Sequence, residues 1–171
     1  ITGIGGCFNE MGWDALNALS AEDREAVLQA IFGKDGACFD YCRLPMGAND
    51  FAMSFYSSAD VAGDFNLVNF NIDRDRYILI PYIKAARQIN PDLRIWASPW
   101  CPPPWMKTNN HYASAVRPSG EKDVNGLLPH EAIAEFSTGF RMEEGYLKTY
   151  ADYFARFIKA YEAEGLPLEC I

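Results

Sequence analysis

Short apolar segments alternate with helical segments along the chain. Strand-like apolar runs occupy residues 3–8, 37–44 and 93–100, and a fourth begins near Pro167. Apolar positions at helical spacing lie between these runs, at residues 13–19, 21–32, 73–90 and 147–161. This βαβαβαβ order predicts an α/β fold with a parallel sheet and right-handed crossovers.

Residues that start or stop helices support these boundaries. Ser20 opens a capping-box pattern before the helix that Gly33 ends. Pro81 must lie in the first turn of the helix over residues 73–90 or kink it, because proline lacks a backbone N–H group. Gly165 closes the last helix before the fourth strand.

Two long connections, residues 45–72 and 101–141, both follow strands. They therefore belong to the carboxyl-end edge of the sheet, where the active sites of α/β proteins form. The pattern alone leaves open a (β/α)8 barrel or an open doubly wound sheet. A dinucleotide-binding interpretation of residues 3–8 fails, because Phe8 stands where the third glycine of that motif belongs.

Composition narrows the class of partner. The chain has 171 residues, 49% of them hydrophobic and 14% aromatic, which is enough for the core of one domain over residues 1–171. A net charge of −8 disfavours nucleic acid, since binding to phosphate depends on lysine and arginine. No stretch approaches the ~18 apolar residues of a transmembrane helix.

Cysteine and histidine spacing gives no support for a metal site or a cofactor. The five cysteines lack metal-type CxxC spacing, and the two histidines form no HxxxH or HExxH pattern. Cys38 and Cys42 are expected on one strand, roughly 13 Å apart, which is too far for a disulfide bond. We therefore expect buried free thiols.

A proline-rich loop with two tryptophans carries the strongest chemical signal. Residues 100–105 read WCPPPW, and the three prolines hold Trp100 and Trp105 on a stiff frame. Flat aromatic faces suit the apolar face of a sugar ring, whereas a phosphate ligand requires glycine amides and cations. The alternative is that both tryptophans belong to the core.

Three motifs resemble glycoside hydrolase family 30, in its glucosylceramidase-like branch. They are residues 3–10 (GIGGCFNE), 43–51 (RLPMGANDF), and 97–100 (ASPW) together with 105–109 (WMKTN). The resemblance implies a TIM (β/α)8 barrel, of which this chain would be the N-terminal half, a partial domain that stops at the start of strand four. It also implies a retaining β-glycosidase acting on β-glucosides, with a glucosylceramide-like or β-1,6-glucan substrate.

The resemblance assigns substrate-binding roles to Arg43, Asp50, Trp100 and Trp105. Arg43 would orient the nucleophile, and an arginine suits that role because its planar fork is always charged. Asp50 would accept hydrogen bonds from sugar hydroxyls, although aspartate is also common in turns. Trp100 would line the sugar subsite, and Trp105, deeper in the loop, is the better candidate for a structural role.

No catalytic residue is assigned within the chain. The family's acid/base lies in an Asn-Glu-Pro motif that the sequence lacks, and both catalytic carboxylates are expected beyond Ile171. Glu10 is interpreted as a loop residue, and Glu143 and Glu144 as complements of a helix dipole. We therefore expect the chain alone to be inactive. The resemblance further implies a carbohydrate or glycolipid substrate, and we expect the intact protein to be secreted or periplasmic.

Two other functions remain open from the residues themselves. One is a non-catalytic carbohydrate-binding α/β module, which would use the same tryptophans without any hydrolysis. The other is a nucleotide-binding α/β domain, which the position of Phe8 and the lack of nearby cations disfavour. An Asn-Glu-Pro motif soon after Ile171 would identify the enzyme, and its absence would favour the binding module.

Overall fold

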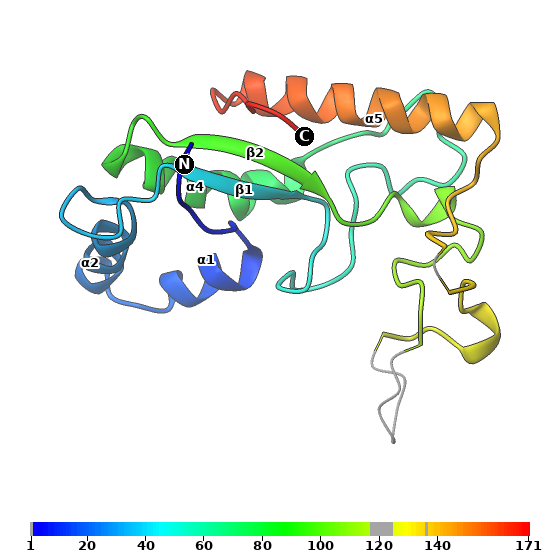
Figure 1. Cartoon of the computed structure of the whole chain (residues 1–171), viewed down its shortest axis with the longest axis horizontal. Coiled ribbons are helices and arrows are strands. Elements are labelled where there is room, and N and C mark those ends of the chain that lie inside the picture. The colour runs from blue at the N-terminus through cyan, green and yellow to red at the C-terminus, as the bar shows by residue number, and fades with distance from the viewer. Residues whose placement is uncertain (1, 117–124, 136) are drawn as a thin grey trace.

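Two parallel strands form the centre of the structure, a computed structural model that describes residues 2–116, 125–135 and 137–171. Strand β1 (Tyr41–Met46) pairs with β2 (Arg94–Pro99), with Tyr41 opposite Arg94 and Met46 opposite Pro99. Figure 1 shows both strands running in the same direction, with the two ends of the chain close to them. The predicted parallel α/β arrangement is confirmed.

Two further segments extend the sheet without forming continuous strands. Cys7 makes a parallel bridge to Arg43, and Cys170 makes one to Trp96. The expected strands over residues 3–8 and from Pro167 are thus shorter than predicted. At the first of them Gly5 allows a close approach, because a Cβ atom there would lie 2.1 Å from the carbonyl oxygen of Tyr41.

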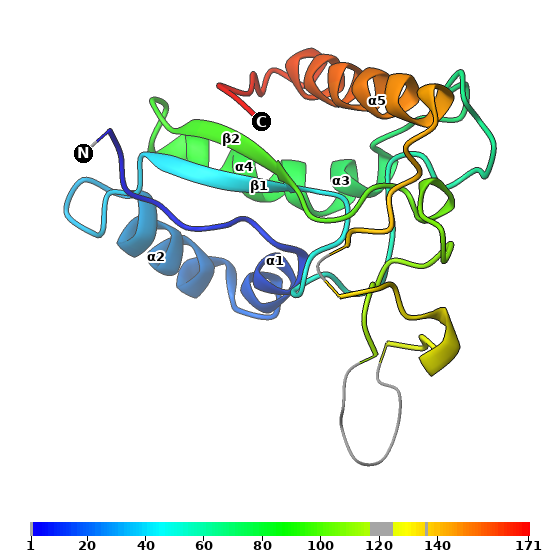
Figure 2. The same ribbon diagram turned by 45° about the vertical axis from the view of Figure 1, so that its right-hand side comes forward.

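Five α-helices lie around this sheet in the part of the chain that the structure describes. They are α1 (Glu10–Asn17), α2 (Ala21–Phe32), α3 (Asp73–Tyr77), α4 (Leu79–Ile89) and α5 (Glu144–Ala163), with single 3-10 turns η1 (Pro104–Met106) and η2 (Pro129–Glu131). Figures 1 and 2 place α4 behind the sheet, α5 along one side of it, and α1 and α2 along the other. None of the helices in the described residues is long and apolar enough to cross a bilayer.

Several boundaries differ from the sequence-based expectation. The first helix begins at Glu10 rather than near residue 13, because Asn9 caps it by accepting a hydrogen bond from the Gly12 N–H group at 2.7 Å. The helix expected over residues 73–90 is interrupted at Ile78, so that two helices replace one. Pro81 lies in the first turn of the second helix, α4, where its missing N–H group breaks no helical hydrogen bond.

The cysteine predictions are corrected in part. Cys38 has a positive φ of 49° and precedes β1, so it does not share a strand with Cys42. All five cysteines are free, as expected, but Cys38 and Cys170 are exposed and only Cys42 is fully buried. The left-handed backbone at Cys38 ends the extended segment, which explains why β1 begins at Tyr41 instead of residue 37.

Alternation along the strands separates a buried face from a half-buried face. In β1, Cys42 and Leu44 point into the core with Ile95 and Ala97 of β2, where they pack with apolar residues of α4 and α5. The opposite face carries Tyr41, Arg43 and Trp96, which are only partly covered. This second face corresponds to the interior of a barrel, where the functional groups of such folds point.

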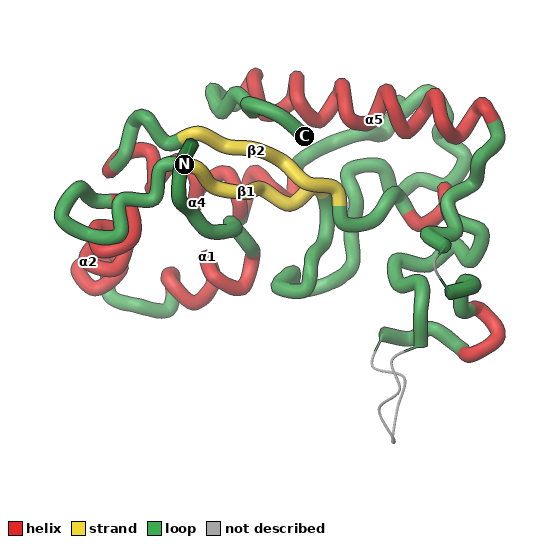
Figure 3. The backbone as a smooth tube through the Cα atoms, viewed as in Figure 1, coloured by secondary structure: helices red, strands yellow, loops and turns green. Residues whose placement is uncertain are grey.

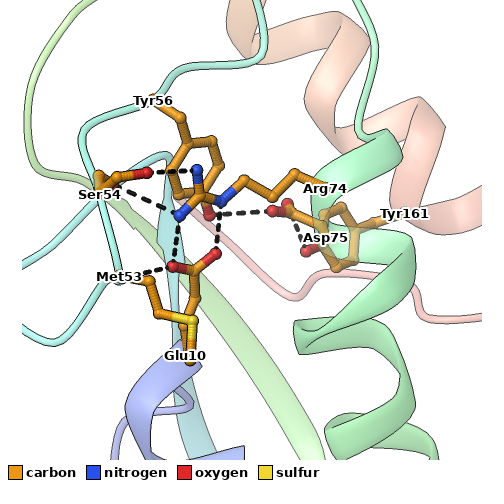
Figure 4. Close-up of polar contacts among 7 residues, drawn as sticks. All are labelled: Glu10, Met53, Ser54, Tyr56, Arg74, Asp75 and Tyr161. Carbon is orange, nitrogen blue, oxygen red and sulfur yellow. Dashed lines mark hydrogen bonds and ion pairs between the residues drawn. The ribbon is translucent and has the colours of Figure 1, made fainter. Parts of the chain in front are cut away.

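A buried carboxyl group joins three separate elements within this core. Asp75 of α3 is 1% exposed, and it accepts hydrogen bonds from the hydroxyl groups of Tyr56 at 3.0 Å and Tyr161 of α5 at 2.7 Å (Figure 4). Burial raises the pKa of Asp75 to about 6, because the lowering effects of both tyrosines and of Arg74 do not offset the loss of hydration. Neighbouring Glu10 adds to this rise.

We expect Asp75 to make the folded state more stable in acid. Its pKa is raised from 3.8 in the unfolded chain, so the stabilisation is complete below 3.8 and is lost as pH rises through about 6. A shift of this size corresponds to ~3 kcal/mol. Replacing Asp75 by Asn should remove this pH dependence, which urea unfolding at pH 4.5 and pH 7.5 would measure.

Asp73→Asn is the matched control, because Asp73 lies in the same helix and is exposed. The unfolding free energy of Asp73→Asn should change between pH 4.5 and pH 7.5 by the same amount as that of the original protein. An equal pH dependence in Asp75→Asn and in the original protein would show that Asp75 does not titrate in this range.

Candidate functional site

The paired strands end side by side, and both long connections leave from that edge. Met46 and Pro99 are the last pair of β1 and β2. Figure 3 shows that the chain beyond this edge consists mostly of loop, as expected for the functional edge of a parallel sheet. Side chains from the ends of β1 and β2 are thereby brought into reach of one another.

Arg43 and Trp100 are in contact at this edge. The guanidinium carbon of Arg43 lies 5.2 Å from the ring centre of Trp100 and 5.9 Å from that of Trp96, its partner across the sheet. The Nε–H group of Arg43 points to the Cys7 sulfur at 3.3 Å. Trp100 remains 40% exposed, so an aromatic surface and a fixed cation lie together on the inner face of the sheet.

Asp50 lies on a turn that follows β1 at the same edge. The Asn49 side chain accepts a hydrogen bond from the Phe51 N–H group at 2.8 Å, and the Asn49 carbonyl accepts one from Ala52 at 3.0 Å. Asn49 is buried, whereas Asp50 is exposed at the tip of the turn. The turn geometry that aspartate favours is present, and it directs the carboxylate to solvent as an available acceptor.

A cavity of about 800 Å³ opens beside Asp50. Its wall combines polar and aromatic groups, and the lining residues are Asn49, Asp50, Ala52, Met53, Ser54, Phe55, Tyr112, Ala113 and Asn125. The rings of Phe55 and Tyr112 stack with their centres 4.6 Å apart. Such a wall offers both hydrogen-bond acceptors and flat apolar surface to a ligand.

Tyr112 is held by both long connections. Its hydroxyl group donates to the carbonyl oxygen of Ala48 at 2.6 Å, and its carbonyl oxygen accepts a hydrogen bond from the Lys107 amino group at 2.8 Å. Burial raises the pKa of Tyr112 to about 12, with smaller contributions from Cys101 and Asp50. The phenol therefore stays a neutral hydrogen-bond donor at ordinary pH.

Trp105 is placed differently from Trp100. It is 8% exposed, its indole N–H group donates to the carbonyl oxygen of Ala59 at 2.8 Å, and the ring of Phe65 packs edge-on at 5.3 Å. The 3-10 turn η1 directs this side chain inward. In the structure, Trp105 joins the two long connections, while Trp100 presents its ring at the strand edge.

Glu10 has a role that the sequence interpretation missed. It was expected to cap or solvate a loop, but it is 2% exposed and forms an ion pair with Arg74, with Oε1 at 2.6 Å from Nε (Figure 4). The partner lies 64 residues away. No local signal identifies such a pair, because neither residue lies in a motif with the other.

The remaining acidic residues singled out in the sequence lie at the start of α5. Glu143 is the N-cap residue of α5 and Glu144 is its first residue, in agreement with the dipole interpretation. Within the described ranges, no group of three or more His, Cys, Asp or Glu residues could hold a metal ion. The structure thus brings Arg43 and Trp100 into contact and places Asp50, as an exposed carboxylate, on the loop that follows β1. A carboxylate, a guanidinium and an aromatic face are groups of the kinds that bind polyhydroxylated rings.

Comparison with known proteins shows the family of the chain. The profile of the glycosyl hydrolase family 30 TIM-barrel domain matches residues 1–171. The chain is 32% identical to a protein named putative glucosylceramidase 4 from Caenorhabditis elegans, over 97% of this chain and 28% of the relative. It is 28% identical to an endo-1,6-beta-D-glucanase from Neurospora crassa, over 100% of this chain and 32% of the relative.

A solved structure supports the same fold. SrfJ from Salmonella typhimurium superposes with a TM-score of 0.78 at 25% identity, over 99% of this chain and 33% of that protein. The chain thus spans about a third or less of the length of these relatives, and the predicted α/β fold as part of a TIM barrel is confirmed. Residues 1–171 belong to glycosyl hydrolase family 30 and form part of its TIM-barrel domain.

Proposed function

We propose that residues 1–171 are the first half of the catalytic barrel of a retaining β-glycosidase, and that they carry part of its sugar-binding subsite. The observation that supports this most is the contact between Arg43 and Trp100 at the end of the strands, 5.2 Å apart. The loop that follows β1 leaves from this same end, and it carries Asp50 and part of the lining of a cavity. A sugar ring needs both an apolar face and charged acceptors for its hydroxyl groups, and this edge supplies both.

In this proposal each residue has a separate role. Trp100 stacks against the sugar ring, and Asp50 accepts hydrogen bonds from its hydroxyl groups. Arg43 points along the inner face of the sheet, where its permanent positive charge would keep a carboxylate nucleophile ionised and oriented. Trp105 supports the loop from behind, as its burial and its bond to Ala59 indicate.

The substrate is proposed from the relatives. Those similar over nearly the whole chain are named glucosylceramidases and endo-1,6-beta-D-glucanases, so we propose a β-glucoside, either glucosylceramide-like or a β-1,6-glucan. A retaining mechanism requires two carboxyl groups about 5–5.5 Å apart, an acid and a nucleophile. We propose that both lie in the part of the barrel beyond Ile171.

The first prediction from this proposal compares the glycosidase activity of the chain of 171 residues with that of the protein extended through the rest of the barrel. The chain of 171 residues should release no aryl leaving group from an aryl β-glucoside, because positioning groups accelerate a reaction only when the reacting groups are present. The protein extended through the rest of the barrel should hydrolyse it. If the chain of 171 residues still hydrolyses the substrate after repeated purification, its own carboxylates carry out the reaction. If the extended protein binds sugar without hydrolysing it, the protein is a binding module.

The second prediction concerns Asp50 in the extended protein. Asp50→Ala should lower kcat/KM for a β-glucoside by roughly ten- to a hundred-fold, because one charged hydrogen bond contributes about 1.5–3 kcal/mol. Asp35→Ala is the control, since Asp35 is an exposed residue in the turn before β1, at the opposite end of the sheet. If Asp50→Ala matches Asp35→Ala in kcat/KM, Asp50 is a turn residue only.

A further inference from the structure

We propose that Glu10 and Arg74 are positioning residues for Asp50. Their ion pair holds the backbone just after the turn that carries Asp50, and so sets where that carboxylate meets the sugar. The inference rests on the proposed function of Asp50. It concerns two residues that do not line the cavity beside Asp50.

The ion pair is bidentate, with the Glu10 carboxylate buried and the Arg74 side chain 30% exposed. Nε of Arg74 lies 2.6 Å from Oε1 of Glu10, and Nη2 lies 2.7 Å from Oε2. The guanidinium carbon sits 4.1 Å from the ring centre of Tyr56, so one face of the cation is covered by an aromatic ring. Two parallel charge-assisted bonds fix both the distance and the orientation of the partners.

The same two side chains also hold the loop. Oε2 of Glu10 accepts a hydrogen bond from the Met53 N–H group at 2.7 Å, and Nη1 of Arg74 donates to the Ser54 hydroxyl at 2.8 Å (Figure 4). Beside Glu10 in α1, the Met11 N–H group donates to the carbonyl oxygen of Phe51 at 3.0 Å. Helix α1 therefore fixes the chain one and three residues after Asp50.

The chain before Asp50 is fixed independently. The Ala48 N–H group donates to the carbonyl oxygen of Tyr56 at 3.1 Å, which closes the base of the loop, and the Tyr112 hydroxyl donates to the Ala48 carbonyl. Asp50 thus lies between two anchored points only a few residues apart. A group held in this way reaches the substrate with little loss of conformational freedom, and a displacement of about 1 Å is costly for catalysis.

A second ion pair on the same helix provides the comparison. Arg76, also in α3, pairs with Glu164 at 2.7 Å, at the end of α5. That pair is more exposed than the Glu10–Arg74 pair, and the ion pairs described for its members join Asp73 and Lys84, which lie outside the loop that carries Asp50. Removing the charge of Glu164 therefore perturbs an arginine of α3 without releasing Asp50.

The test is a double-mutant cycle in the extended protein, with kcat and KM measured on an aryl β-glucoside. Glu10→Gln should lower kcat/KM by roughly ten-fold when Asp50 is present. In the Asp50→Ala background the same change should have an effect of about two-fold or less, because residues that act through one another are not additive. Glu164→Gln should leave kcat/KM unchanged in both backgrounds.

Each other outcome has a distinct meaning. Equal losses from Glu10→Gln in both backgrounds, or no loss in either, would overturn the positioning role. No effect of Asp50→Ala by itself would count against the proposed function of Asp50 instead. If Glu10→Gln does not fold, Arg74→Lys keeps the positive charge but loses the two parallel bonds to Glu10, and it must show the same dependence on Asp50, or the inference is wrong.

Discussion

The parallel register of β1 and β2 is the constraint on which the arrangement of the site depends. Because Met46 lies opposite Pro99, the two strands end together, and the connections that follow them begin side by side. A shift of one residue would turn Arg43 from the inner face to the packed face, since successive side chains of a strand point in opposite directions. The contact between Arg43 and Trp100 is a direct consequence of this register.

Polar groups inside the structure connect elements that apolar packing alone would leave loosely oriented. Glu10 and Arg74 join α1 to α3, while Asp75 joins α3 to α5 through Tyr161 and to the loop through Tyr56. Buried charges cost hydration free energy, so such pairs contribute little net stability when compared with apolar residues of the same shape. Their main effect is geometric, because each hydrogen bond accepts only a narrow range of positions.

The family assignment gives the fold, and the local geometry gathers the exposed groups at one edge of the sheet. The profile match covers residues 1–171, and the exposed Asp50, the cavity beside it and the ring of Trp100 all lie after the ends of the strands. This is where barrel enzymes place their binding groups, since loops there vary while the strands keep their register. Trp105 and Tyr112 hold the two long connections together, since they donate hydrogen bonds to the carbonyl oxygens of Ala59 and Ala48.

Local sequence patterns determined most of the secondary structure. Ser20 caps α2 as its side chain accepts the Asp23 N–H group, Pro81 lies in the first turn of α4, and apolar spacing identified α5. These signals depend on residues within a few positions of one another. The same locality led to errors at residue 37, where the left-handed backbone of Cys38 delays the strand, and at Ile78, where one expected helix becomes two.

Tertiary structure alone decided which side chains work together. The motifs suggested Arg43, Asp50 and Trp100, yet only the strand register brings Arg43 beneath Trp100. The sequence offered no sign that Glu10 pairs with Arg74, since a bond across 64 residues depends on how the helices and loop pack. The residue types and the helix and strand signals depend on neighbours in the sequence, so the sequence alone determines them. Burial and pairing between distant residues depend on the folded chain, so only the tertiary structure decides them.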